Sequence, residues 1–196
     1  MKLKSYLVAI ILYLISSCNL YAIDPEIFVQ STVNRASKIL SEDISKEKKM
    51  LKLQEIAKDT VDIKGIGFYT LGSIRKNLNE SQKDEYGNLF EKYFLKSFSS
   101  RLAEYTNPEI DVIGKEVLNE KYTIVNSLLK GTAERPEIKI DWRIYTKNKD
   151  KPLIRDLVIE GLSLARTQKE EFNSVLQSNN NDMTALFKTL KSFIND

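Results

Sequence analysis

Apolar and polar side chains alternate with a period of two in the second half of the chain. From residue 138 to residue 145, apolar residues occupy the even positions, and charged residues or tyrosine occupy most of the odd ones. Such alternation is typical of a strand with one buried face. Similar runs predict strands over residues 110–117, 122–129 and 153–162. The links between these strands are short, which favours antiparallel neighbours.

Apolar spacings of three and four predict helices on both sides of these strands. Asp24, Ser45, Asp62 and Asn79 are suited to cap the first four helices. The longest runs to about Tyr105 and carries a wide, aromatic-rich face: Tyr86, Leu89, Phe90, Tyr93, Phe94, Phe98, Leu102 and Tyr105. Two more helices follow the last strand. We therefore predict an α+β fold, with N-terminal helices and the long helix packed on a four-stranded antiparallel sheet, followed by C-terminal helices.

The first 22 residues have the pattern of an export signal. A short basic region with Lys2 and Lys4 precedes an apolar run that is too short to cross a bilayer core of about 30 Å. Ala22 fits a signal-peptidase site, so we expect cleavage there and a single domain over residues 23–196. Residues 15–18 also resemble a lipobox, which leaves acylation of Cys18 as the alternative. Either route exports the chain, and we expect a periplasmic protein.

Charge and the missing histidine exclude several function classes. Without Lys2 and Lys4, the chain keeps 28 basic and 27 acidic residues, so no overall field favours nucleic acid. The chain has no histidine, and its one cysteine lies in the leader. Histidine-dependent nucleophilic catalysis and the usual structural zinc sites therefore lack their residues. We expect no enzyme activity, no metal and no cofactor.

The region after residue 138 carries three linked motifs. Residues 140–144 read I-D-W-R-I, residues 156–164 read D-L-V-I-E-G-L-S-L, and residues 168–172 end in a phenylalanine. They resemble the V-D-Y-R-L, D-V-x-I-E-G-V-S-L and Y-R-x-x-F motifs of the MlaC family, also called toluene-tolerance proteins. The tyrosine of the last motif is Gln168 here. The approach to the last strand, K-P-L-I at residues 151–154, also departs from the family's G-x-W-K-V.

Upstream segments add to this resemblance in the same order. Residues 60–63 and 70–72 lie where the family has F-D-F and A-L-G. Residues 81–82 open the long helix as T-P-E-Q does in the family, and residues 102–105 close it. The resemblance covers roughly residues 24 to 190.

The resemblance implies a periplasmic phospholipid carrier. Such a carrier would shuttle phospholipid between an outer-membrane lipoprotein complex and an inner-membrane ABC transporter complex with an MCE domain, which maintains outer-membrane lipid asymmetry. Its only ligand would be phospholipid, and it would touch membrane surfaces transiently as a monomer.

The resemblance also changes how the apolar faces are interpreted. From the residues alone, an aromatic helix face and an apolar sheet face make an ordinary core. The family implies an apolar cavity between them that holds lipid tails. The lining candidates are Phe68, Leu71, Phe90, Phe94, Phe98, Ile140, Trp142, Ile144, Val158 and Leu162. The candidates for head-group or partner contacts are Arg75, Lys76, Arg143 and Arg166.

Two other function classes remain open at this stage. Asp141, Asp156 and Glu160 lie on neighbouring predicted strands, where a carboxylate pair could do the acid–base work of a hydrolase. An ion pair with a nearby arginine is the commoner use of such carboxylates. A purely structural envelope protein is the third class.

Overall fold

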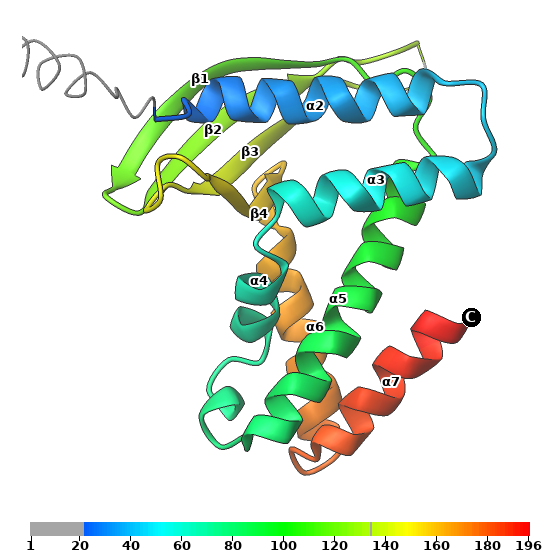
Figure 1. The fold of residues 1–196 in the computed structure, drawn as a ribbon, viewed down its shortest axis with the longest axis vertical. Helices are drawn as coiled ribbons and strands as arrows, with labels where there is room; N and C mark the ends of the chain where they lie inside the picture. The colour runs from blue at the N-terminus through cyan, green and yellow to red at the C-terminus, as the bar shows by residue number, and fades with distance from the viewer. Residues whose placement is uncertain (1–21, 134) are drawn as a thin grey trace, which may run out of the picture.

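The computed structural model describes residues 22–133 and 135–196, so the first 21 residues of the predicted leader, including Cys18, lie outside the described residues. Within the described residues, four α-helices precede the sheet, with a short 3-10 helix before the last of them, and two α-helices follow it (Figure 1). The helices are α2 (Pro25–Ser41), α3 (Lys46–Thr60), α4 (Ile63–Thr70), η1 (Ile74–Lys76), α5 (Glu80–Leu102), α6 (Leu164–Ser178) and α7 (Met183–Asn195). The order of elements confirms the predicted α+β class.

The predicted capping residues begin the first four α-helices. The side chains of Asp24, Ser45 and Asp62 each accept a hydrogen bond from a backbone N–H in the first turn. Asn79 and Gln82 form a reciprocal capping box at the start of α5. A cap satisfies N–H groups that have no partner within the helix, and each cap contributes about 1 kcal/mol.

The sheet has five antiparallel strands in sequence order, rather than the predicted four. They are β1 (Ile110–Asn119), β2 (Tyr122–Leu129), β3 (Ile138–Tyr145), β4 (Leu153–Ile159) and β5 (Leu162–Ser163). The predicted last strand is split because Glu160 and Gly161 adopt φ values of 49° and 82° and turn the chain back on itself. Only β5 is new, and its two residues pair with the end of β4.

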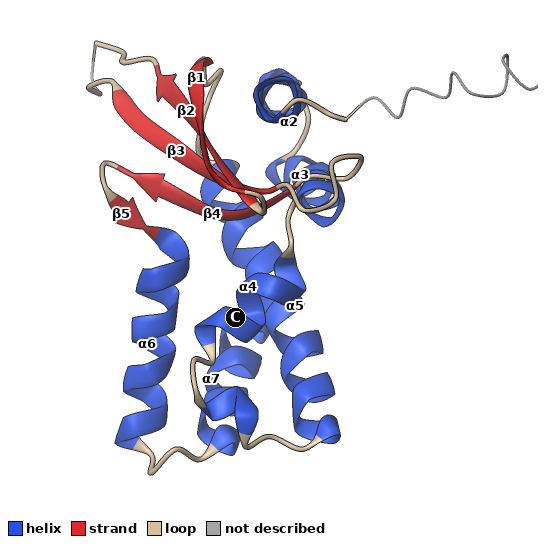
Figure 2. Ribbon diagram, turned by 90° about the vertical axis from the view of Figure 1, so that its left-hand side faces the viewer, coloured by secondary structure: helices blue, strands red, loops and turns tan. Residues whose placement is uncertain are grey.

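The two faces of the sheet differ in burial, as the alternation predicts. Val125, Trp142 and Leu157 are neighbours across β2, β3 and β4 on the inner face. Helix α2 packs on β1 and β2. Its Gln30 covers the outer edge of β1, since the side-chain amide donates to the carbonyl of Ile110 and accepts from the N–H of Val112. Figure 2 shows α2 and the start of α6 on different sides of the curved sheet.

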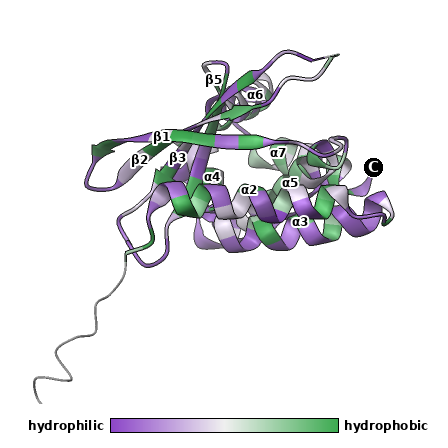
Figure 3. Cartoon of the chain, turned by 90° about the horizontal axis from the view of Figure 1, so that it is seen from above, coloured by the Kyte–Doolittle hydropathy of each residue, from purple (hydrophilic) through white to green (hydrophobic). Residues whose placement is uncertain are grey.

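The long helix α5 lies away from the sheet, which corrects one detail of the predicted packing. Its main contacts are with α3, α4 and α7, while α2, α4 and α6 are the helices that pack on strands. In Figure 1, α5 descends from the level of α3 beside α4 and α6. Figure 3 shows α2 and α3 side by side, each with hydrophilic and hydrophobic residues along its length. Even so, α5 and the inner face of the sheet contribute to one continuous core.

Candidate functional site

The inner face of β3 forms one wall of the core, which we call the sheet wall: Ile140, Trp142 and Ile144. All three side chains are buried, with Ile144 fully so. The indole N–H of Trp142 donates to the Ser127 hydroxyl at 2.8 Å, and that hydroxyl donates to the Ile140 carbonyl at 3.0 Å. This wall is therefore fixed by hydrogen bonds as well as by packing.

A second wall of the same core comes from aromatic residues of α5, which we call the helix wall: Phe90, Phe94 and Phe98. Phe90 is buried, whereas Phe94 and Phe98 are only partly buried. The ring centroids of Phe90 and Phe94 lie 6.1 Å apart, and those of Phe94 and Phe98 lie 5.7 Å apart in a stacked arrangement. The helix wall therefore presents a row of rings whose outer part reaches the surface.

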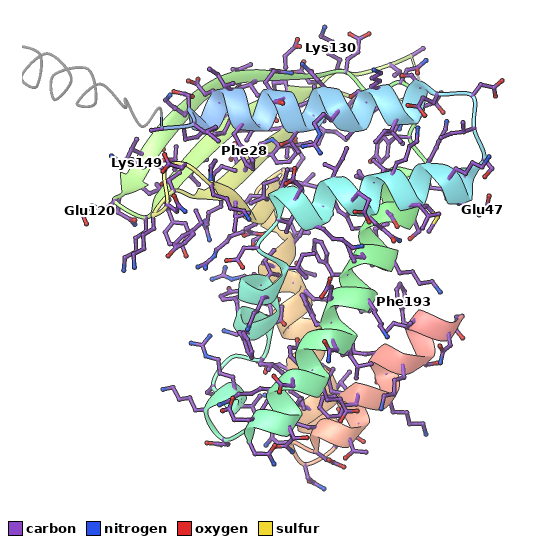
Figure 4. The ribbon with its side chains drawn as sticks, in the orientation of Figure 1. Phe28, Glu47, Glu120, Lys130, Lys149 and Phe193 are labelled. Atoms are coloured by element: carbon purple, nitrogen blue, oxygen red, sulfur yellow. The ribbon has the colours of Figure 1, made fainter. Side chains whose placement is uncertain are left out.

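The helix wall is extended by α7 and by the segment around α4. Phe193 of α7 turns toward α5, where its ring lies 4.8 Å from the ring of Tyr93 (Figure 4). Leu71 at the end of α4 is fully buried, and Phe68 is partly buried. The glycine at position 67 explains how close α4 comes, because a Cβ there would meet the Phe90 ring at 2.7 Å.

One buried polar pair joins α4 to α5. The hydroxyls of Thr70 and Tyr86 are 2.7 Å apart, and Thr70 also donates to the Gly67 carbonyl. Burial raises the pKa of the Tyr86 phenol well above its usual value, and the Thr70 hydrogen bond only partly opposes this shift. The phenol is therefore neutral at physiological pH and acts as a structural group.

Two residues predicted to line the cavity lie elsewhere. Val158 pairs across the ladder with Asp141, on the face opposite to Trp142. Leu162 is 58% exposed on β5. The other eight lining candidates belong to the core or pack against it.

A pocket of about 310 Å³ opens where α4 and the start of α6 meet the outer face of the sheet. Its lining residues are Gly65, Ile66, Tyr69, Leu118, Tyr122, Arg143, Arg155, Asp156 and Ala165. The α4 and α6 side is apolar, while the strand side carries two arginines and a carboxylate. Ile66 and Ala165 belong to both this pocket and the core, so the pocket adjoins the apolar interior.

Arg155 ties the strand side of this pocket to the start of α4. Its guanidinium donates to the Asp62 carboxylate at 2.6 Å and to the Tyr122 hydroxyl at 2.7 Å. It also lies over the Tyr145 ring, 4.0 Å from the centroid. Partial burial lowers the pKa of Arg155, but the hydrogen bonds that it donates to Asp62 and Tyr122 outweigh this effect and hold the pKa above its usual value. Arg155 is therefore a charged structural link between helix and sheet.

Asp156 is held by the start of α6. Its carboxylate accepts from the Ser163 hydroxyl at 2.6 Å and from the Ala165 N–H at 3.0 Å. The Arg143 guanidinium lies 3.9 Å away, beyond hydrogen-bonding distance, and its side chain is 44% exposed. The Asp156 carboxylate therefore positions α6 and leaves Arg143 largely free.

The four predicted head-group or partner contacts do not lie together in this pocket. Arg143 lines it, whereas Arg75, Lys76 and Arg166 are exposed and line no part of it. Arg75 donates to the Phe68 carbonyl at 3.2 Å. No sequence pattern identified Arg155, because its role depends on a bulge in β4 that is visible only in the strand register.

The carboxylates considered for catalysis are engaged in structural bonds. Asp141 accepts from the Asn126 side-chain amide at 2.8 Å. Glu160 accepts from the backbone N–H of Lys139, and Asp156 is bound as described above. Within residues 22–133 and 135–196, no cluster of three metal-binding side chains occurs. No helix in this part of the chain is long and apolar enough to span a bilayer.

Comparisons with known proteins place the chain in a family. The family model described as "MlaC protein" matches residues 30–192. No curated protein matches the chain significantly. A phospholipid-binding protein from Ralstonia solanacearum, whose structure contains a phospholipid, has a similar fold with a TM-score of 0.75 and 16% sequence identity. The match covers 88% of this chain and 98% of that protein. Because the family model spans most of its length, the chain belongs to the MlaC family of non-enzymatic phospholipid carriers.

Proposed function

We propose that this protein binds the acyl chains of a phospholipid between the helix wall and the sheet wall and carries the lipid across the periplasm. Membership of the MlaC family is the observation that carries this proposal. The fold shared with a Ralstonia protein that binds phospholipid supports it. Of the lining candidates, we retain the eight that belong to the core or pack against it, and we drop Val158 and Leu162.

The physical basis is the burial of methylene groups. Each one contributes about 0.8 kcal/mol when it leaves water, so two acyl chains supply a large driving force without specific polar contacts. The cavity opens by displacement of the partly buried rings of Phe94 and Phe98, while the sheet wall stays in place. No titrating group is needed, which agrees with a chain that has no histidine.

The partners follow from the family rather than from any contact in the structure. The carrier would collect phospholipid from an outer-membrane lipoprotein complex and deliver it to an inner-membrane ABC transporter complex with an MCE domain, or the reverse. It would touch each membrane surface transiently and act as a monomer. Crosslinking of the exported protein in cells, followed by identification of the captured proteins, tests this assignment.

Lipid analysis of the purified protein tests the carrier function. We expect about one phospholipid per protein after organic extraction and mass spectrometry, because one pair of walls offers one site. The delipidated protein should reload from vesicles. Trace amounts in the composition of the bulk membrane, unchanged after exposure to vesicles, would contradict the proposal.

The N-terminus decides whether the carrier is free or tethered. We expect the mature chain to begin at Ile23 and to contain no cysteine. In the structure, Ile23 donates its N–H to the Lys149 carbonyl, which anchors the start of the domain to the β3–β4 link. Intact mass of the exported protein measures this directly. A diacylated Cys18 would instead make it a membrane-tethered carrier.

A further inference from the structure

We infer that the pocket between α4, α6 and the outer face of the sheet binds the phosphate of the lipid head group, with Arg143 as its ligand. The inference rests on the proposed carrier function and adds to it a specific site for the phosphodiester. The strand side of this pocket carries arginine side chains, whereas its helix side is apolar.

Arg143 is the group in this pocket with donors to spare. A guanidinium has five N–H donors, and Arg143 donates no hydrogen bond to any residue that the structure describes. Its nearest carboxylate, Asp156, is 3.9 Å away and already accepts from Ser163 and Ala165. By contrast, Arg155 forms an ion pair with the Asp62 carboxylate. A planar guanidinium with free donors is suited to bind phosphate through two parallel hydrogen bonds.

The apolar side of the pocket gives the lipid its direction. Ile66 and Ala165 line the pocket and also belong to the core. A phosphate at Arg143 therefore places the glycerol at these side chains and directs the acyl chains toward the core that the helix wall and the sheet wall share. Tyr69 and Leu118, at 42% and 45% exposure, form an apolar rim outside. The volume of about 310 Å³ lies at the small end of ligand pockets, which suits a head group rather than two acyl chains.

The test compares two lipids that share their acyl chains and glycerol backbone, one with a phosphodiester head group and one without it. Delipidated protein is exposed to vesicles that contain either phosphatidylglycerol or diacylglycerol with identical acyl chains, and bound lipid is measured by mass spectrometry. We expect the native protein to prefer phosphatidylglycerol by about tenfold, as charge-assisted hydrogen bonds imply. Arg143→Gln should remove that preference and leave diacylglycerol loading unchanged, and Arg143→Lys should restore part of it.

Lys139→Gln is the matched control. It removes a cation from the same face of β3, outside the pocket, and should behave like the native protein. Thermal melting should show both variants folded, because Arg143 is nearly half exposed.

The outcomes separate this inference from the carrier function. If the native protein loads both lipids equally, or if Arg143→Gln keeps the preference, the phosphate site is refuted and the carrier stands. If Arg143→Gln lowers loading of both lipids alike, Arg143 has a structural role and the inference fails. If neither lipid loads into native protein, the carrier function itself fails. Inorganic phosphate is titrated separately, and saturable binding that requires Arg143 without any lipid preference would refute the lipid assignment.

Discussion

The inner face of β3 and the aromatic face of α5 both contribute to the core, but different forces hold them. Strand β3 is paired on both sides, by β2 and β4, over most of its length. Its Trp142 is also fixed by the hydrogen bond to Ser127. Moving this wall would break ladder hydrogen bonds, and buried polar groups that lose their partners are costly.

The helix wall depends on side-chain packing instead. No backbone hydrogen bond joins α5 to another helix or strand that the structure describes, so the helix can shift as a body without breaking a ladder of such bonds. Phe94 and Phe98 are stacked on each other and partly exposed. We therefore expect the helix wall to move when a lipid enters and the sheet wall to stay.

A charge in the sheet wall should have the largest effect. Trp142→Asp would place an unpaired carboxylate at a buried position in the middle of β3. It would also leave the Ser127 hydroxyl without the N–H that donates to it. We expect a loss of several kcal/mol, enough to unfold the domain. Thermal melting measures it, and Trp142→Phe, which keeps the ring area but loses the N–H, is the control. If the Trp142→Asp protein folds and only fails to load lipid, the sheet wall is also able to move.

The same charge in the helix wall should affect loading more than stability. Phe94 is partly exposed, so the carboxylate of Phe94→Asp can remain hydrated at the surface when no lipid is bound. We expect a folded protein with only a modest decrease in melting temperature and no bound lipid. Melting and lipid content should be measured on the same sample. Normal loading would remove Phe94 from the site, and unfolding would make it ordinary core.

Asp62 joins α4 to the sheet in two ways, and two substitutions separate them. This residue caps α4 and pairs with Arg155 of β4. Asp62→Asn keeps a capping side chain but loses the ion pair, whereas Asp62→Ala loses both. We expect Asp62→Ala to be less stable than Asp62→Asn by about 1 kcal/mol in urea unfolding. Equal stability of the two variants would show that the cap contributes nothing here.

The buried hydroxyl pair of Thr70 and Tyr86, which joins α4 to α5, predicts that the stability of the fold is sensitive to alkaline pH. The pKa of Tyr86 is raised in the folded state, so its neutral form stabilises the fold fully below the ordinary value of about 10. This stability is lost as pH rises above 10, because the unfolded chain then releases a proton that the folded chain retains. Tyr86→Phe should therefore lose less stability above pH 10 than the native protein does. Unfolding curves across that range measure the difference.

At neutral pH the same substitution should have the smallest effect. Tyr86→Phe removes one donor from the Thr70 hydroxyl, which still donates to Gly67. We expect a cost of about 1 kcal/mol. Adding Thr70→Val should recover part of it, since no buried hydroxyl is then left with an unmet partner. A double variant that shows simple additivity would mean that the two hydroxyls are not coupled.

Local patterns in the sequence are enough to define much of the secondary structure of this protein. Alternation fixed which residues of β3 face inward, because a strand side chain has only two directions. The capping residues and Gln82 located the start of α5, since a helix start requires acceptors for its free N–H groups. The order and spacing of the motifs indicated the family, which the match to residues 30–192 confirmed.

Which of these elements meet, and therefore where the pocket lies, depends on long-range packing that local patterns do not specify. The bulge at Arg155 shifts the register of β4, so Leu157 and Ile159 face inward in place of Asp156 and Val158. One extra residue in a strand moves every later side chain to the opposite face of the sheet, and no local sequence pattern predicts such a bulge. Any apolar partner can bury the aromatic face of α5. The spacing of its aromatic residues therefore predicts a buried face, but not whether helices or strands cover it. The pocket likewise brings together α4, α6 and strands β1 to β4, whose approach depends on packing between segments that are far apart in the chain.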